Sequence, residues 1–314
     1  MVKRRIGLVG YGHVGQHLHN FILRQSNLEL VFIWNRTRDV LVNAEIPETL
    51  ILDDLDNVGS RKCDLIVEVA HPDITKKYGA EFLKHADYMI GSPTALADED
   101  LEYSLRELAN EGKHGLYVPV GALWGAEDIR RMANAGILQA LTITMTKHPS
   151  AFRLSGKLNE LNEEAASTSR PVTLYEGGIR ALCRLAPNNV NTMAAAALAA
   201  HNLGFDKVQG KLVSDPKELG WHIITIEVLG SPQPNGTQLS IRTERRNPAD
   251  VGAVTGSATY ASFANSLLAA YGRGAGFHLH FRIRTKPANG LTGLSLARVI
   301  GCLYGCTTER SKII

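Results

Sequence analysis

The sequence is poor in cysteine and has no long apolar run. Four cysteines in 314 residues lack the paired spacing of zinc ligands, which argues against a metal site and favours a reducing compartment such as the cytoplasm. The longest apolar run, 193–200, is far shorter than the roughly 18 residues that span a bilayer. The basic start of the chain soon reaches glycines, unlike a signal peptide. We therefore expect neither a membrane segment nor a bound metal.

Aromatic residues make up only 6% of the chain, but its hydrophobic share of 44% and charged share of 21% are ordinary for a globular protein. The length suggests about two domains. The net charge of +3 comes from the end of the chain, because residues 273–314 hold seven Lys and Arg against one Glu. The residues before them carry 27 basic and 30 acidic groups, which gives no reason to expect nucleic-acid binding.

Short apolar strands alternate with helical patterns over residues 1–122. Strands are expected at 4–10, 28–34, 63–69, 88–91 and 115–120, and helices at 14–25, 74–85 and 98–112. This alternation predicts an α/β domain with a Rossmann-type, doubly wound parallel sheet.

Beyond residue 122 the expected strands become longer and few helices separate them. Strands are predicted at 138–146, 207–213, 222–229 and 238–244, and helices at 191–202 and 257–271. This pattern indicates an α+β domain with an open, largely antiparallel sheet. The predicted organisation is a dinucleotide-binding domain at 1–122, a catalytic domain at 123–246, a helix at 247–272 that packs back on the first domain, and a basic extension of unknown role at 273–314.

A glycine motif joins the first expected strand to the first helix. In Gly10-Tyr11-Gly12-His13-Val14-Gly15, the first glycine permits a tight turn and the second lets the backbone approach a pyrophosphate. The third allows close packing of helix on strand, and the helix N-terminus faces the anion. The motif predicts dinucleotide binding through Gly10, Gly12, His13, Val14 and Gly15; the alternative is a structural glycine turn.

The second expected strand ends in Asn35-Arg36-Thr37-Arg38, without a carboxylate for the ribose 2′-hydroxyl of NAD. Arg36 or Arg38 could hold a 2′-phosphate instead. We therefore expect Asn35 and Arg36 to contact the cofactor and NADP to be accepted as well as NAD. The alternative is a solvated basic loop.

Two further segments carry small or amide residues at places where a cofactor could lie. Residues 119–125 follow the last strand of the first domain, where small residues let the backbone approach a nicotinamide. Residues 187–191 present three asparagines, two of them Asn189 and Asn191, before an alanine-rich helix. The alternatives are a plain domain-joining turn and helix capping.

Histidine is the natural acid or base near neutral pH. His222 starts an apolar strand after a turn, and His201, His71 and His148 are further candidates. Spacing alone does not choose among them. The pair His278 and His280 is too small a set to predict a metal site.

Taken in order, these segments resemble the L-aspartate dehydrogenase family. The matching strings are GLVGYGHVG, LIVEVAHPDITKKYG, VGALWG, TMTKHPSAF, LAPNNVNTMAAA and DPKELGWHI, followed by Asn247-Pro248. The resemblance implies oxidation of L-aspartate to iminosuccinate with NAD or NADP, and then release of oxaloacetate and ammonia; in some organisms the imine serves NAD biosynthesis.

The resemblance also implies roles for single residues. It places the catalytic histidine at His222, cofactor contacts at Ala122, Asn191 and its neighbour Asn189, and a substrate contact at Lys147. The alternative for Lys147 is a plain surface charge.

Val120 stands where related sequences often have Ser. Two alternatives therefore stay open: an NADP-dependent reductase of another small amino or keto acid, and a non-catalytic NADP(H)-binding protein. The expected partners are a small-molecule substrate and a second copy of the chain in a homodimer, which would cover the open sheet.

Overall fold

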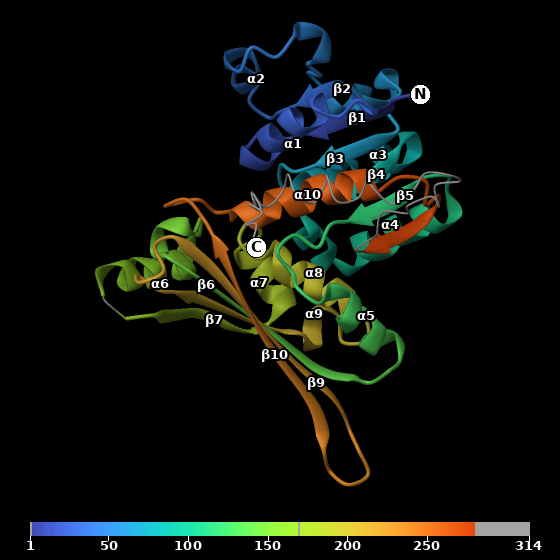
Figure 1. The fold of residues 1–314 in the computed structure, drawn as a ribbon. Coiled ribbons are helices and arrows are strands. Elements are labelled where there is room, and N and C mark those ends of the chain that lie inside the picture. Colours follow the sequence, from blue (N-terminus) through green and yellow to red (C-terminus); the bar gives the residue numbers. More distant parts are fainter. Residues whose placement is uncertain (1, 169, 280–314) are drawn as a thin grey trace, which may run out of the picture. The chain divides into compact units, whose positions relative to one another are not determined.

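The computed structural model describes residues 2–168 and 170–279, which belong to one compact unit (Figure 1). Two sheets organise this unit. In the described part of the chain, no helix is long and apolar enough to cross a membrane.

The first sheet has six parallel strands in the order β11-β5-β4-β3-β1-β2. Its strands are β1 (Arg4–Val9), β2 (Leu28–Trp34), β3 (Leu65–Glu68), β4 (Asp87–Ile90), β5 (Gly115–Val118) and β11 (Gly276–Leu279). The helices that accompany it are α1 (His13–Leu23), α2 (Asp39–Asn43), α3 (Pro72–His85), α4 (Glu99–Glu111) and α10 (Ser257–Ala269), with 3₁₀ turns η1 (Glu48–Leu50), η2 (Leu55–Arg61) and η3 (Pro93–Ala97). The predicted Rossmann-type sheet is thereby confirmed.

The sixth strand corrects the expectation for residues 273–314. β11 pairs with β5, so its residues complete the sheet instead of forming a separate extension. Phe277 lies under the Arg106 guanidinium at 3.5 Å, and Arg130 donates a hydrogen bond to the Leu279 carbonyl at 3.2 Å. A strand of four residues has too few alternating positions for periodicity to distinguish it from a basic tail. The rest of that segment, 280–314, lies outside the described residues.

The second sheet has five strands in the order β10-β9-β6-β8-β7. They are β6 (Leu138–Lys147), β7 (Val172–Gly178), β8 (Gln209–Ser214), β9 (Trp221–Pro232) and β10 (Gln238–Pro248), and β9 and β10 form a long hairpin (Figure 1). Three of its four pairings are antiparallel, and β6 with β8 is parallel. The predicted α+β part with a largely antiparallel sheet is confirmed.

The expectation of few helices in this second part is wrong. It contains α5 (Ala126–Asn134), α6 (Gly156–Ser167), α7 (Ile179–Leu185), α8 (Asn191–Ala199), α9 (Gly204–Lys207) and the 3₁₀ turn η4 (Pro149–Ala151). Several are short, and the interior of α6 is rich in Asn and Glu with few apolar positions. Such helices give little apolar periodicity and depend on tertiary packing.

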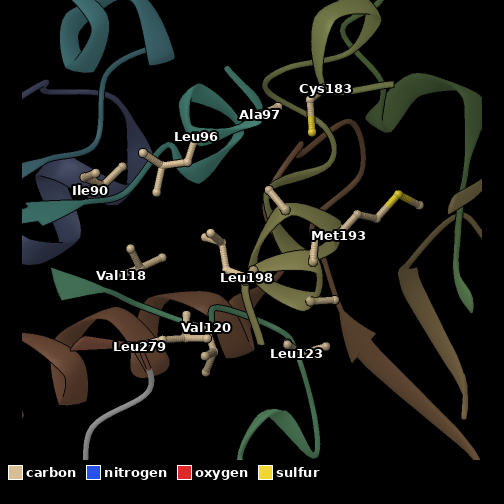
Figure 2. Packing of buried hydrophobic residues seen from close by; sticks show 14 of the residues in the cluster. Ile90, Leu96, Ala97, Val118, Val120, Leu123, Cys183, Met193, Leu198 and Leu279 are labelled. Carbon is tan, nitrogen blue, oxygen red and sulfur yellow. The ribbon is translucent and has the colours of Figure 1, made fainter. Parts of the chain in front are cut away.

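α8 is buried on all sides and links the parts of the core. Every residue of the helix after Asn191 is buried, and the side chains are mostly alanine. It contacts η3, α5 and β11; Leu198 points toward Val118 and Val120, whereas Met193 extends to the other side of the helix (Figure 2). Because alanine is small, neighbouring backbones can approach the helix closely. α8 therefore fixes the position of Asn191 at its start.

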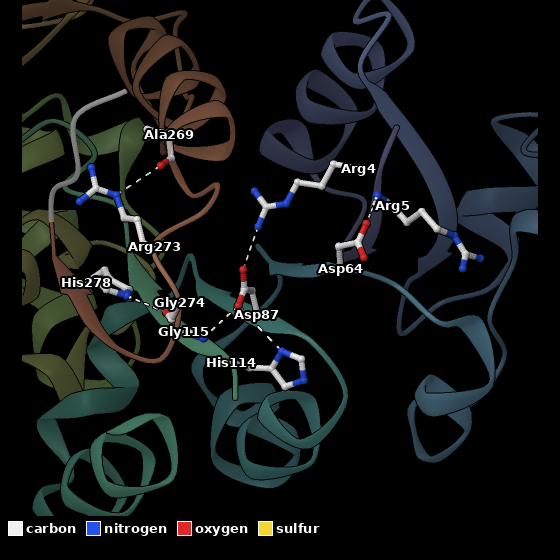
Figure 3. Close-up of polar contacts among 10 residues, drawn as sticks. All are labelled: Arg4, Arg5, Asp64, Asp87, His114, Gly115, Ala269, Arg273, Gly274 and His278. Atoms are coloured by element: carbon white, nitrogen blue, oxygen red, sulfur yellow. Dashed lines mark hydrogen bonds and ion pairs between the residues drawn. The ribbon is translucent and has the colours of Figure 1, made fainter. Parts of the chain in front are cut away.

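The amino ends of the parallel strands are joined by one acid. Asp87, at the start of β4, accepts hydrogen bonds from Arg4 Nη2 at 3.0 Å and from the Gly115 N–H at 2.9 Å (Figure 3). It thereby ties β1, β4 and β5 together at this edge. The opposite edge, where the same strands end, borders the site described next.

Candidate active site

A cavity of about 320 Å³ lies between the carboxyl ends of the parallel strands and the strands β6, β9 and β10. Eight of the twelve predicted site residues line it, namely Gly12, His13, Val14, Ala122, Lys147, Asn189, Asn191 and His222. The other four, Gly10, Gly15, Asn35 and Arg36, are not part of its lining.

The glycine turn meets three different steric demands. Gly10 has φ +107°, and a Cβ on it would lie 2.9 Å from Ala70. A Cβ on Gly15 would lie 2.1 Å from the Gly10 carbonyl oxygen, so the helix packs tightly on the strand. A Cβ on Gly12 would meet no protein atom within 4 Å, and no side chain caps α1. The protein therefore leaves room for an anion beside Gly12 at the helix N-terminus, which fits a dinucleotide pyrophosphate.

The polar residues that follow β2 differ in the contacts that they make. Asn35 Oδ1 accepts the Tyr11 N–H at 3.0 Å, so this amide supports the glycine turn. Arg38 forms ion pairs with Glu48 and with Asp53. Arg36 is exposed, and no described residue forms an ion pair with it. Of the two arginines, Arg36 is the one left available for a phosphate.

Three polar side chains form a row across the second sheet. Lys147 on β6 pairs with His222 on β9, which pairs with Asn247 on β10. Their exposed fractions are only 2%, 6% and 3%, and all three line the cavity. The sequence names Asn247 only within a string of the family resemblance and gives it no role; the strand register shows its place beside His222. The row brings the predicted base and the predicted substrate cation side by side.

His222 is a neutral imidazole at physiological pH. Burial, and next the positive charge of Lys147, lower its pKa to about 4, although a backbone hydrogen bond at Ala253 acts in the opposite direction. In the free protein, the pKa of this imidazole therefore lies well below the near-neutral value that is usual for histidine. Nε2 is buried and has no hydrogen-bond partner among the described residues. An uncharged, unpartnered nitrogen at a cavity wall is able to accept a proton from a ligand.

Lys147 is buried, which rules out the alternative of a surface charge. Burial lowers its pKa to about 8, so it remains mostly protonated at neutral pH. Nζ donates a hydrogen bond to the Val254 carbonyl at 3.0 Å. No aspartate or glutamate lines the described cavity. A buried ammonium group without a carboxylate favours an anionic ligand.

The competing histidines have local structural roles. His201 Nε2 pairs with Asn134 Oδ1 at 2.8 Å, and His201 does not line the cavity. His71 and His148 accept hydrogen bonds from backbone N–H groups at the starts of α3 and η4. Of the four candidates, only His222 lines the cavity.

The asparagines before α8 do not cap it. The N-cap residue is Val190, and no side chain caps the helix. Asn189 bonds the backbone of Arg153 with both ends of its amide, at 3.2 and 2.7 Å. Asn191 Oδ1 accepts the Thr94 hydroxyl at 3.4 Å. Both are held at the cavity wall by contacts between different segments.

Comparison with known proteins identifies the two parts of the chain. Residues 10–119 match the model "Homoserine dehydrogenase, NAD binding domain", and residues 128–266 match "Aspartate dehydrogenase, C-terminal". The chain therefore contains an NAD-binding domain, and the predicted cofactor, NAD or NADP, is confirmed.

Whole-chain relatives agree with these matches. An aspartate dehydrogenase domain-containing protein of Xenopus tropicalis is 55% identical over 276 residues, covering 87% of this chain and 96% of the relative. An L-aspartate dehydrogenase of Methanopyrus kandleri is 30% identical over 72% of this chain and 83% of its own length.

Among solved structures, the aspartate dehydrogenase of Thermotoga maritima has the same fold. Its TM-score is 0.61 at 19% identity, with 86% of this chain and 97% of that chain covered. Together with the NAD-binding domain, these likenesses place the protein among the NAD(P)-dependent oxidoreductases. The resemblance seen in the sequence is confirmed, and the chain belongs to the aspartate dehydrogenase family.

Proposed function

We propose that the protein oxidises L-aspartate to iminosuccinate with NAD or NADP, and that the imine is then hydrolysed to oxaloacetate and ammonia. One observation carries this proposal: the glycine turn opens into a cavity with no acidic residue among its described lining, whose far wall presents a protonated Lys147 beside a neutral His222. The cavity thus combines a place for a dinucleotide, a cation for a carboxylate, and a base.

The bound nicotinamide ring supplies the chemistry of hydride acceptance. In aspartate oxidation the Cα–H bond breaks, the hydride leaves, and a C=N bond forms as the nitrogen loses a proton. We assign that proton to His222 Nε2. Lys147 would pair with one substrate carboxylate, exchanging its bond to the Val254 carbonyl for a charged one. Both groups are buried, so bulk water competes little with the substrate.

The remaining predicted residues would hold the cofactor. Gly12, His13 and Val14 lie at the start of α1, where backbone N–H groups favour a pyrophosphate. Ala122, Asn189 and Asn191 line the cavity on the other side. Gly10, Gly15 and Asn35 would act by shaping the turn, and exposed Arg36 would contact a 2′-phosphate.

Formation of NAD(P)H from L-aspartate by purified protein tests the proposal. The reverse assay mixes NADPH, oxaloacetate and ammonia and omits ammonia in a parallel sample, because consumption without ammonia would indicate a keto-acid reductase instead. His222→Ala should lower aspartate turnover roughly 10²–10⁴-fold if the imidazole is the base. Tight NADPH binding with no turnover of any small amino or keto acid would contradict the proposal and leave a cofactor-binding protein.

We also propose that two copies associate through the second sheet. Its residues alternate along β6: Leu141, Ile143, Met145 and Lys147 are buried, while the threonines between them remain partly exposed. A sheet face of this kind can be covered by a second copy. The cytoplasmic location indicated by the few cysteines remains a prediction.

A further inference from the structure

Glu68 is a buried acid for which the proposed reaction has no use. It is the last residue of β3, and its side chain is completely inaccessible to solvent. The main influences on its ionisation are burial and hydrogen bonds from uncharged groups of the described residues. A buried carboxylate without a cation is costly because it gives up its hydration. The fold therefore has to compensate for this charge in another way.

Four hydrogen bonds provide the compensation. Glu68 Oε1 accepts the Ala70 N–H at 2.6 Å, the His71 N–H at 2.9 Å and the Ser92 hydroxyl at 3.0 Å. Oε2 accepts the Ser92 N–H at 3.1 Å. The donors belong to the two segments that follow β3 and β4. One carboxylate thus fixes these two segments relative to each other.

Both segments border the cavity. Ala70, Gly91 and Ser92 are among its lining residues. Ala70 also lies close to the glycine turn, because a Cβ added to Gly10 would be only 2.9 Å from Ala70. Displacing Ala70 or Ser92 would therefore change the surface on which a dinucleotide lies, even though Glu68 itself is not part of the lining.

Only an ionised carboxylate satisfies all four donors. A protonated acid or an amide carries hydrogen on one of the two atoms toward which donors already point. Burial raises the pKa of Glu68 to about 7, and the same hydrogen bonds act against that rise. The geometry of the two segments thus depends on the charge of one side chain.

We propose that Glu68 is a positioning residue for the dinucleotide. It acts through Ala70 and Ser92, holding the cavity wall beside the glycine turn in the shape that the cofactor needs, and it does not touch the reacting atoms. This inference rests on the proposed function only in taking NAD(P) as the ligand; it does not depend on which acid is oxidised.

The test is a fluorescence titration of the full chain with NADPH, together with steady-state kinetics. Glu68→Gln keeps the shape of the side chain but turns one acceptor into a donor. We expect its Kd for NADPH to rise about tenfold or more, since hydrogen bonds to charged groups are strong. The kcat at saturating cofactor should stay within about threefold, because Glu68 acts on cofactor affinity and not on the chemical step.

Asp87→Asn is the matched control, because Asp87 is also a largely buried carboxylate of this sheet but lies at its amino edge. It should lower the melting temperature without changing the Kd for NADPH. An unchanged Kd in Glu68→Gln, or an equal rise in both variants, would overturn the inference.

If Glu68→Gln does not fold, Ser92→Ala removes one of the four bonds and should raise the Kd at least twofold; no rise would again overturn the inference. A wild-type protein that binds NADPH but does not oxidise aspartate would contradict the proposed function alone.

Discussion

At the scale of single residues, the site depends on two groups whose charges are coupled. Lys147 and His222 are neighbours on adjacent strands, and the ammonium charge helps to keep the imidazole neutral. A dianionic ligand would offset that charge and make His222 more basic. In the proposed reaction, this arrangement would make the imidazole a stronger base when a dianionic substrate is bound.

These charges predict the pH profile of kcat/KM for aspartate. Activity should fall as the pH drops through about 4, where His222 becomes protonated and can no longer accept a proton. It should also fall as the pH rises through about 8, where Lys147 loses its charge. Initial rates at low substrate concentration measure both limbs.

The substitution Lys147→Arg tests whether the fall in activity at high pH comes from Lys147 or from the amino group of the substrate, because arginine stays charged. The limb should move to higher pH in this variant, with NADPH affinity as the check on folding. A limb that does not move would exclude Lys147 as its origin.

Sequence reasoning can identify residues whose chemistry follows from a local motif, and it fails where the role depends on distant neighbours. The glycine turn is predictable because each glycine serves a local steric need. Asn247 and Glu68 acquire their places only from strand register and from the approach of two loops. The lowered pKa of His222 cannot be predicted from sequence for the same reason, since burial and the neighbouring Lys147 come from the fold.

At the scale of elements, we propose that the connection from β2 to α2 distinguishes the two nicotinamide cofactors. Arg36→Ala should raise the KM for NADP by roughly tenfold, the loss of one charge-assisted contact to a 2′-phosphate. The KM for NAD should change little, because NAD lacks that phosphate. Parallel kinetics with both cofactors give the ratio.

Arg38→Ala is the control, since Arg38 is already engaged by Glu48 and Asp53. It should leave the ratio of the two KM values near that of the wild type. A ratio that changes with Arg38 but not with Arg36 would reverse the assignment.

Elements were predictable where the apolar pattern is strong and local. The strand 28–34 is found with the expected bounds, and the bounds of β1, β3, β4 and β5 lie within two residues of expectation. The sequence does not predict α2, α5, α6, α7, α9, β7 or β11, and most of these elements are too short or too polar to leave a clear period. β11 is stabilised by pairing with β5, a partner more than 150 residues away in the sequence.

At the scale of the whole molecule, the two faces of the second sheet carry different side chains. One face carries the apolar side chains and the row of Lys147, His222 and Asn247. The other carries Thr142, Thr144 and Thr146 opposite Glu227, Thr225 and Ile223. Each strand residue belongs to one face only, so the site and a subunit contact can share the sheet without sharing side chains.

The proposed dimer can be tested on the threonine face. Thr144 lies in its centre beside Thr225, which is only 8% exposed. Thr144→Arg would place two unpaired charges in the contact, so we expect a monomer by sedimentation velocity where the wild type sediments as a dimer. Ser104→Arg, on an exposed position of α4, is the matched control and should stay dimeric. A wild-type monomer, or a Thr144→Arg dimer of unchanged stability, would show that the sheet face is not the interface. NADPH binding by a Thr144→Arg monomer would show that the cofactor site is complete within one chain.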